Sequence, residues 1–239
     1  MIDEQRLSEI LLQDVTLRLV EPHIYSPYGS GENTNPYHRM GNVYDLVACS
    51  RLYNRIVWGY KTDAYHALCL DALRSSKGGW VLDAGCGSLA FTARAYADYT
   101  ERPVVFLDQS ITLLRLAKSR LAKLNGKIPD SMVFLHGDIL RLPFKPKSFG
   151  TVMALNVLHV LQDARVVVQE LRKVLLDGGM LSLTTLIEGG RLADKYLHML
   201  GKAGALVPRT ADELFAVFEA LGMPIECSIQ GNMAFIYCK

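Results

Sequence analysis

Residues Trp80–Thr92 have the sequence WVLDAGCGSLAFT, in which a short apolar run enters a glycine turn and then a segment with a helical pattern. The run WVLDA is short and apolar and is bounded by glycines, so it predicts a buried β-strand. Glycine tolerates positive φ angles and lets a ligand approach the backbone closely. A helix over 89–99 would offer free N–H groups and a partial positive charge to an anion. This stretch therefore predicts a strand, a turn and a helix that leave room for a ligand at the turn.

Four more apolar runs follow, with helical patterns between them. We expect strands at 104–108, 132–138, 150–156 and 180–186. Ser110 and Asp163 are expected N-caps, and the helix over 164–176 is expected to end at Gly178 and Gly179. Strands that are apolar throughout and alternate with helices predict a parallel sheet covered on both faces. Right-handed crossovers make this a doubly wound α/β sheet.

The expected sheet also indicates where a ligand would bind. Doubly wound sheets bind ligands at the carboxyl ends of their strands, near the point where the strand order reverses. This rule selects four segments before any family is considered. They are residues 83–88, 108–110, 138–139 and 156–159.

Two flanking regions complete the chain. Residues 1–75 show helical patterns around an irregular middle rich in Pro, Gly, Asn and Tyr, and loops of that length are commonly functional. Residues 190–209 predict one helix, and Thr210 is the expected cap of another. The last two apolar runs, at 225–229 and 233–239, predict an antiparallel edge hairpin.

Composition limits the class of protein. Hydrophobic residues make up 50% and charged residues 21% of the 239 residues, which is typical of a globular domain, and the net charge of +2 does not favour a nucleic-acid partner. No apolar run approaches the roughly 20 residues that span a bilayer. The N-terminal stretch MIDEQRLSEI lacks the apolar segment of a signal peptide, so we expect a cytoplasmic location. The five cysteines are scattered, without a CxxC pair, and the histidines form no metal-ligand pattern, so we expect reduced thiols and no metal site.

Five segments, in order along the chain, resemble the motifs of class I S-adenosylmethionine-dependent methyltransferases, in the branch that is similar to ubiquinone and menaquinone biosynthesis enzymes. They are DAGCG at 83–87, FLDQS at 106–110, HGDILRLPF at 136–144, LNVLHVL at 155–161 and LLDGGMLSLTTL at 175–186. The resemblance implies a Rossmann-like, seven-stranded, mostly parallel sheet in the order 3-2-1-4-5-7-6, with an antiparallel edge strand. It also implies a cofactor-binding methyltransferase domain over 76–239 and an N-terminal helical lid over 1–75.

The resemblance assigns S-adenosylmethionine as the cofactor, S-adenosylhomocysteine as its product, and a set of binding residues. The set comprises Asp83, Ala84, Gly85, Cys86, Gly87, Asp108, Gln109, Gly137, Asp138, Ile139, Asn156, Tyr44 and Tyr53. In this assignment the glycine turn holds the methionine portion, and Asp108 accepts hydrogen bonds from both ribose hydroxyls. Asp138 accepts from the adenine amine, and Asn156 lines the sulfonium end.

Methyl transfer from a sulfonium is an in-line displacement in which the protein mainly positions the reactants, an effect worth on the order of 7–11 kcal/mol. A general base is needed only if the acceptor loses a proton. His159 is the candidate, since imidazole titrates near neutrality, and the alternative is that it only orients its loop. One departure from the family is Leu89, which stands where a third glycine is common. We expect its side chain to narrow the pocket near the cofactor's amino acid.

Three functions remain open. The first is transfer of a methyl group to an O, C or N atom of a small-molecule acceptor, by a monomer or a homodimer. The second is an RNA or protein methyltransferase, against which stand the lack of an NPPY-type or PC-type motif and of a basic extension. The third is a non-catalytic cofactor-binding protein of the same fold, which Leu89 and the uncertain base leave open.

Overall fold

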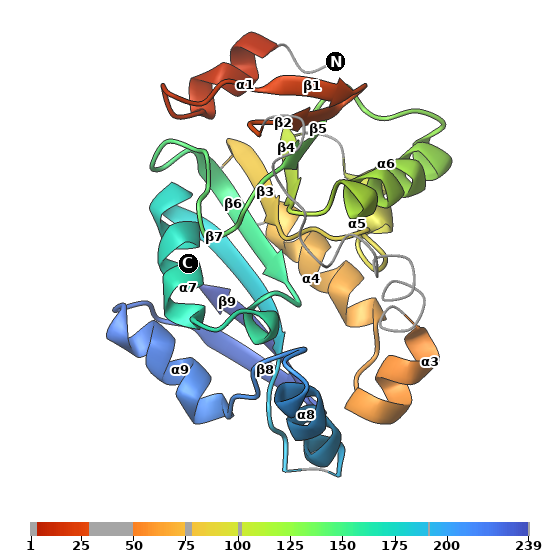
Figure 1. The fold of residues 1–239 in the computed structure, drawn as a ribbon, viewed down its shortest axis with the longest axis vertical. Helices are drawn as coiled ribbons and strands as arrows, with labels where there is room; N and C mark the ends of the chain where they lie inside the picture. Colours follow the sequence, from red (N-terminus) through yellow and green to blue (C-terminus); the bar gives the residue numbers. More distant parts are fainter. Residues whose placement is uncertain (1–3, 29–49, 75–77, 100–101, 191, 239) are drawn as a thin grey trace.

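A nine-stranded sheet forms the centre of the molecule in the computed structural model, which describes residues 4–28, 50–74, 78–99, 102–190 and 192–238 (Figure 1). The strands are β1 (Arg18–Glu21), β2 (Ile24–Ser26), β3 (Trp80–Ala84), β4 (Val104–Asp108), β5 (Met132–His136), β6 (Phe149–Leu155), β7 (Leu175–Leu186), β8 (Glu226–Gln230) and β9 (Met233–Cys238). The helices are α1 (Glu4–Ile10), α3 (Arg51–Tyr53), η1 (Asn54–Trp58), α4 (Asp63–Arg74), α5 (Ala93–Asp98), α6 (Ile111–Asn125), η2 (Leu158–Val160), α7 (Ala164–Val174), α8 (Ala193–Lys202) and α9 (Ala211–Ala220).

The order of the sheet is β1-β2-β5-β4-β3-β6-β7-β9-β8. Strands β5, β4, β3, β6 and β7 are parallel to their neighbours within this run, and β9 is antiparallel to both β7 and β8. From β5 to β8 this is the predicted order 3-2-1-4-5-7-6, so the Rossmann-like fold with an antiparallel edge is confirmed. The predicted count of seven strands is wrong, because β2 adds to β5 in parallel and β1 adds to β2 in antiparallel orientation.

The extra strands correct the helical interpretation of the N-terminal segment. Residues 18–26 form a hairpin, and Ile24 and Tyr25 pair with Phe134 and Leu135 of β5. Strands this short gain their stability from the neighbour they pair with, and β5 would otherwise be an open edge. The segment is helical at α1, α3 and α4. The division at residues 75 and 76 and the lid role stay predictions.

Three helix limits also differ from expectation. The helix after the glycine turn begins at Ala93 rather than at residue 89, because Leu89 has a φ of 55° that interrupts a right-handed helix. No helix N-terminus therefore lies directly at the turn. Helix α7 ends at Val174, since Leu175 already pairs with Phe149 of β6 and starts β7. The helix expected over 190–209 is limited to α8.

Two buried clusters cover the two faces of the sheet. Leu82 and Val105 pack on one face with residues of α7 and α9, whereas Val81 and Phe106 pack on the other with residues of α4, α5 and α6. Successive residues of β3 thus point to opposite faces, as a strand requires. A third cluster joins η1, α4, α8 and β9. Figure 1 shows α8 and α3 at the end of the molecule opposite α1.

Arg102 ties the amino ends of the central strands together. Its buried guanidinium donates hydrogen bonds to the backbone oxygens of Gly78 and Gly79, at 2.8 and 2.9 Å. It also donates to Oγ1 of Thr151 at 2.9 Å. These contacts connect β6 with the segment that precedes β3. They lie at the amino ends of the strands, so they do not occupy the carboxyl ends, where a ligand is expected.

Candidate functional site

The loops after β3, β4 and β5 are linked to one another by backbone hydrogen bonds. The N–H groups of Gly85 and Cys86 both donate to the oxygen of Leu107, at 2.7 and 3.0 Å. The N–H of Gly137 donates to the backbone oxygen of Asp108 at 3.0 Å. The structure therefore brings the predicted glycine turn, Asp108 and Gly137 together at one edge of the sheet.

The two glycines of the turn differ in the space around them. Gly85 has a φ of 73°, and a Cβ there would lie 2.7 Å from Cγ2 of Val157. Gly87 has a φ of 56°, and among the described residues a Cβ there would meet nothing within 4 Å. No described side chain therefore occupies the Cβ position of Gly87, where a ligand could approach the backbone.

The Asp108 carboxylate is oriented by two backbone groups. The N–H of Gly87 donates to its Oδ2 and the N–H of Ser110 donates to its Oδ1, each at 2.8 Å. A carboxylate oxygen can accept more than one hydrogen bond. A pair of neighbouring hydroxyl groups fits this arrangement.

Asp83 is buried with one oxygen unsatisfied. Its Oδ2 accepts a hydrogen bond from the Tyr96 hydroxyl at 2.7 Å, and its Oδ1 has no hydrogen-bond partner among the described residues. Burial raises the pKa of this carboxyl to about 7, and the charge of Asp108 also raises it, against the opposing effect of the Tyr96 hydrogen bond. A buried acceptor without a partner is costly, so this oxygen suits a cationic or N–H donor group of a ligand.

Leu89 does not narrow the site, and that expectation is wrong. Its side chain is 2% exposed and belongs to the buried cluster that contains Cys69 and Tyr96. The left-handed backbone at this residue turns the side chain into the core. Burial of leucine compensates here for a conformation that glycine would adopt without strain.

The N-terminal hairpin reaches the loop that follows β4. His136 contacts the backbone oxygen of Gln109 through Nε2 at 3.1 Å, and its Nδ1 lies 3.0 Å from Oγ of Ser26. A carbonyl oxygen only accepts, so Nε2 donates and Nδ1 accepts from the serine. Tyr28 contacts the His136 ring edge to face, with ring centroids 5.1 Å apart. Sequence reasoning did not single out Ser26, and the IYSPY stretch, with tyrosines at positions 25 and 28, was the available signal.

The two residues after Gly137 are placed differently. Oδ1 of Asp138 accepts the N–H of Leu140 at 2.9 Å, which fixes the carboxylate in a turn, and its side chain is partly exposed. Ile139 is buried in the core cluster that contains Phe144. The backbone of this turn therefore lies beside Gly137, while the isoleucine side chain anchors it to the core.

Asn156 follows β6 in a strained conformation with a φ of 61°. Its N–H donates to the oxygen of Thr184 at 2.9 Å, and its Oδ1 accepts from the Tyr65 hydroxyl at 2.6 Å. Non-glycine residues held at positive φ gather at functional sites. Tyr65 was not a sequence candidate, because its partner lies 91 residues away in the chain.

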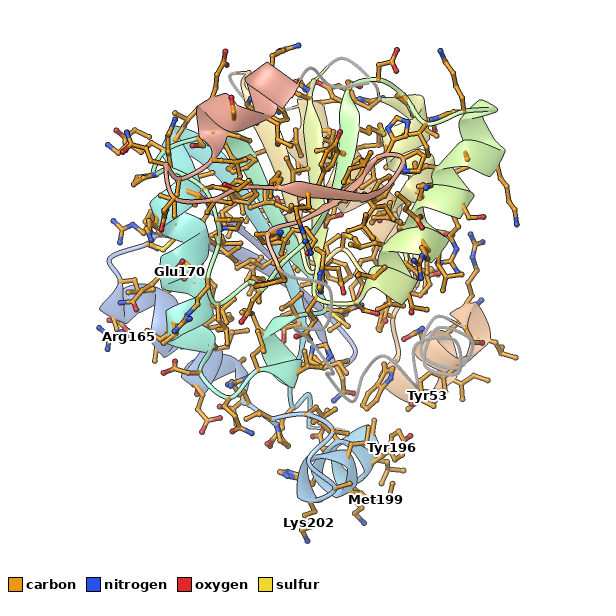
Figure 2. All side chains as sticks on the ribbon, turned by 45° about the horizontal axis from the view of Figure 1, so that its top comes forward. Tyr53, Arg165, Glu170, Tyr196, Met199 and Lys202 are labelled. Atoms are coloured by element: carbon orange, nitrogen blue, oxygen red, sulfur yellow. The ribbon has the colours of Figure 1, made fainter. Side chains whose placement is uncertain are left out.

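Tyr65 belongs to an aromatic cluster, which consists of Tyr53, Trp58, Tyr60, Tyr65, Phe91, Tyr196 and Phe235. Tyr53 donates from its hydroxyl to that of Tyr196 at 3.3 Å, so α3 and α8 meet here (Figure 2). Tyr53 thus packs against the same buried cluster as Tyr65. Tyr44, the other tyrosine of the predicted lid, lies outside the described residues.

The geometry of His159 argues against a general base. Its ring is buried, and Nδ1 accepts the N–H of Leu186 at 3.2 Å. The neutral ring therefore carries its proton on Nε2. Burial and, to a lesser extent, the positive charge of Arg209 together lower the pKa of His159 to about 4. The backbone oxygen of His159 also accepts the N–H of Val207.

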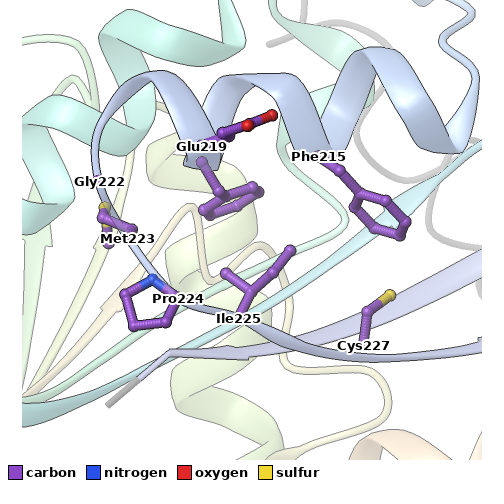
Figure 3. A pocket seen from close by; sticks show the side chains of 8 residues that line it. Phe215, Glu219, Gly222, Met223, Pro224, Ile225 and Cys227 are labelled. Atoms are coloured by element: carbon purple, nitrogen blue, oxygen red, sulfur yellow. The ribbon is translucent and has the colours of Figure 1, made fainter.

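A hollow of about 490 Å³ lies elsewhere, between α9 and β8 at the edge of the sheet (Figure 3). Its lining includes Phe215, Phe218, Met223 and Cys227. None of the predicted site residues lines it. Among the described residues, no group of three His, Cys, Asp or Glu side chains is placed to hold a metal ion.

Residues 82–183 match the family described as a methyltransferase domain. The match agrees with the resemblance to class I S-adenosylmethionine-dependent methyltransferases, which is thereby confirmed for this part of the chain. The match contains all of the predicted site residues from Asp83 to Asn156.

Relatives and a solved structure agree with the domain. An uncharacterized chloroplastic methyltransferase of Arabidopsis thaliana is 34% identical over 49% of this chain and 34% of its own length. A demethylmenaquinone methyltransferase of Staphylococcus epidermidis is 30% identical over 46% of this chain and 44% of its own length. The chain therefore spans less than half the length of these curated relatives. The structure of the cyclase SpnF shares the fold, with a TM-score of 0.63 and 18% identity over 88% of this chain and 98% of its own.

Proposed function

We propose that this chain transfers a methyl group from S-adenosylmethionine to an O, C or N atom of a small-molecule acceptor. One observation carries the proposal: the open backbone at Gly87, the oriented carboxylate of Asp108 and the unsatisfied Oδ1 of Asp83 share one edge of the sheet. The three features suit a ligand that presents a vicinal diol and an ammonium group. When bound, the cofactor supplies the electrophilic methyl group.

In this proposal the residues of the chain bind the cofactor and orient it. Asp108 would accept from both ribose hydroxyls through its two carboxylate oxygens, each of which can accept more than one hydrogen bond. Asp83 would accept a hydrogen bond from the ammonium group. Its carboxyl, which is protonated in part when no ligand is bound, would then be ionised and paired with that cation. Gln109, Gly137, Asp138 and Ile139 would surround the adenine, and Asn156 would line the sulfonium end.

The aromatic cluster supports an acceptor with an apolar or planar body. Its members approach the site through Tyr65, which touches Asn156, and aromatic faces bind both apolar groups and cations. The relative from Staphylococcus epidermidis is named for a small-molecule acceptor, demethylmenaquinone. Since His159 is held as a hydrogen-bond acceptor, we assign it a positioning role and no proton transfer.

Calorimetric titration with S-adenosylmethionine and S-adenosylhomocysteine tests the binding half of the proposal. Asp108→Ala should weaken binding by about 1.5–3 kcal/mol, or roughly ten- to a hundredfold in Kd. Asp177→Ala is the matched control, because this carboxylate is 83% exposed and, among the described residues, forms an ion pair with Lys147 alone. Equal affinity of Asp108→Ala and the wild type would remove Asp108 from its assigned place.

Turnover has to be measured separately, because a shared fold does not establish a shared reaction. A panel of phenols, quinols and isoprenoid acceptors, followed by release of S-adenosylhomocysteine, tests the catalytic half. Cofactor binding without turnover on small molecules, RNA or protein would favour the non-catalytic alternative. The cytoplasmic location and the homodimer stay predictions. Among the described helices, none has the length and apolar character that crossing a membrane requires.

A further inference from the structure

Several of the most exposed large apolar side chains lie on two neighbouring helical segments, α3 with η1 and α8. Leu192, Ile56 and Leu52 are the three most exposed large hydrophobic residues of the described chain, at 84%, 68% and 67%. Met199 is 55% exposed. Leu52 and Ile56 lie on α3 and η1, and the other two lie on or next to α8. Isolated exposed apolar residues are ordinary, but a group of four on neighbouring helices marks an interaction surface.

The two helices form one structural unit. The ring centroids of Trp58 and Tyr196 lie 5.6 Å apart, and the Tyr53 hydroxyl contacts that of Tyr196. Leu197 of α8 is fully buried in the same cluster as Trp58. Figure 2 shows Tyr196 on the side of α8 toward Tyr53, and Met199 and Lys202 on its outer side.

Basic side chains accompany the apolar ones. Arg51 and Arg55 are exposed beside Leu52 and Ile56, and Lys195 and Lys202 are exposed on α8. Among the described residues, Arg55, Lys195 and Lys202 form no ion pair, and Arg51 meets Asp63 at 3.7 Å with both side chains about 80% exposed. Such an exposed pair is weak. Segments 51–58 and 192–202 contain a single carboxylate, Asp194, whose Oδ1 accepts from Gly189 and Asn232.

We propose that this surface, which we call the α3–α8 face, docks on an anionic lipid bilayer. Exposed Leu, Ile and Met side chains flanked by Lys and Arg are the pattern of helices that lie in the membrane interface. Tyr and Trp side chains prefer the same zone, and the face contains Tyr53 and Tyr196 at its centre. The apolar side chains enter the interface, and the cations meet lipid phosphates. This inference does not rest on the proposed function.

Flotation of the full chain with lipid vesicles tests the proposal. We expect binding to phosphatidylcholine vesicles that contain about one third phosphatidylglycerol, and little binding to phosphatidylcholine alone. High salt should release the protein, because it screens the exposed charges. Circular dichroism and calorimetric titration of S-adenosylmethionine confirm that each variant is folded.

Two variants remove the two halves of the α3–α8 face. Leu52→Gln/Ile56→Gln/Leu192→Gln/Met199→Gln should abolish flotation, and Arg55→Gln/Lys202→Gln should weaken it about tenfold or more. The controls change exposed apolar side chains (38–55% exposed) and exposed basic side chains on other elements. They are Leu19→Gln/Leu124→Gln/Val166→Gln/Leu176→Gln and Lys123→Gln/Arg165→Gln, and both should bind as the wild type does.

The following results would overturn the proposal. The wild type fails to float with anionic vesicles, or the controls lose binding as much as the face variants do. Light scattering shows a dimer that the apolar variant converts to a monomer, in which case a second copy of the chain covers the face. The vesicle readout is independent of turnover, so failure of the proposed methyl transfer would leave it unchanged.

Discussion

The hydroxyl of Tyr65 on α4 donates a 2.6 Å hydrogen bond to Oδ1 of Asn156, the residue that follows β6. A helix of the N-terminal segment thereby sets the amide of a strained loop residue at the candidate sulfonium end. The hydrogen bond fixes the orientation of the Asn156 amide, with its oxygen toward Tyr65.

Tyr65→Phe should lower turnover about tenfold while the Kd for S-adenosylmethionine changes less than about twofold, because a lost hydrogen bond is worth about 1 kcal/mol and the ring stays in place. Steady-state kinetics with a known acceptor, and calorimetry, measure the two quantities. Tyr60→Phe is the control, since Tyr60 donates an equivalent 2.6 Å bond to Asn54 in the same aromatic cluster. If both variants lose the same activity, Tyr65 has only a packing role.

Asp83→Asn should change how stability depends on pH. The wild-type carboxyl keeps its proton in the folded state up to a pKa of about 7, against 3.8 for the free group. The unfolded chain therefore binds fewer protons at this group between these values, so the contribution of Asp83 to the free energy of unfolding should fall as pH rises from about 4 to 7. The effect is measured as the difference between the variant and the wild type. The asparagine variant can still accept from Tyr96 and should lack this fall.

Urea unfolding at several pH values between 4 and 8 measures the effect. Asp177→Asn, at an exposed carboxylate, should keep the wild-type dependence. Parallel curves for Asp83→Asn and the wild type would show that Asp83 is ionised in the folded protein.

An alanine variant is usually more stable than a glycine variant at the same position, and at Leu89 we expect this difference in stability to vanish or to change sign. Both Leu89→Ala and Leu89→Gly lose a buried side chain, at a cost of about 2–5 kcal/mol. Alanine keeps the strain of a φ of 55°, and glycine relieves roughly 1 kcal/mol of it. We expect Leu89→Gly to be at least as stable as Leu89→Ala in urea unfolding.

Leu114 supplies the comparison, because it is buried within helix α6. There Leu114→Gly should be less stable than Leu114→Ala by about 1 kcal/mol, the ordinary helical penalty of glycine. The prediction for Leu89 fails if the two positions show the same difference.

His159→Asn should retain turnover, and it should alter stability only in acid. In the wild type, burial lowers the pKa of the ring from 6.5 to about 4, so the unfolded chain binds more protons between these values. The contribution of His159 to the free energy of unfolding should therefore fall as pH drops from about 6.5 to 4, and the variant should lack this contribution. Asp83 contributes with the opposite sign in this range, so the quantity compared is the difference between the variant and the wild type. A folded variant without any turnover would restore the base role.

The parts of the fold that could be predicted are those whose signals are local. Strands β3 to β7 are apolar along most of their length, and Ser110, Asp163 and Thr210 cap helices through their side chains as expected. Strands β1 and β2 were missed because their formation depends on pairing with β5, more than 100 residues away in the chain. At Leu89, burial outweighs a local backbone preference.

The candidate site divides in the same way. The glycine turn, Asp108 and Gly137 could be found because each directly follows a strand. Tyr65 and Ser26 could not, since their partners Asn156 and His136 are 91 and 110 residues away. The role of His159 depends on which group faces Nδ1, and a sequence motif does not encode that contact.

Arg102 has a practical consequence for any search for inactive variants. It holds the oxygens of Gly78 and Gly79 and the hydroxyl of Thr151, at the end of the strands opposite the ligand loops. A screen that scores only loss of methylation would return this arginine together with Asp108. Recording the soluble yield of every clone separates the two, because damage at position 102 removes the protein itself.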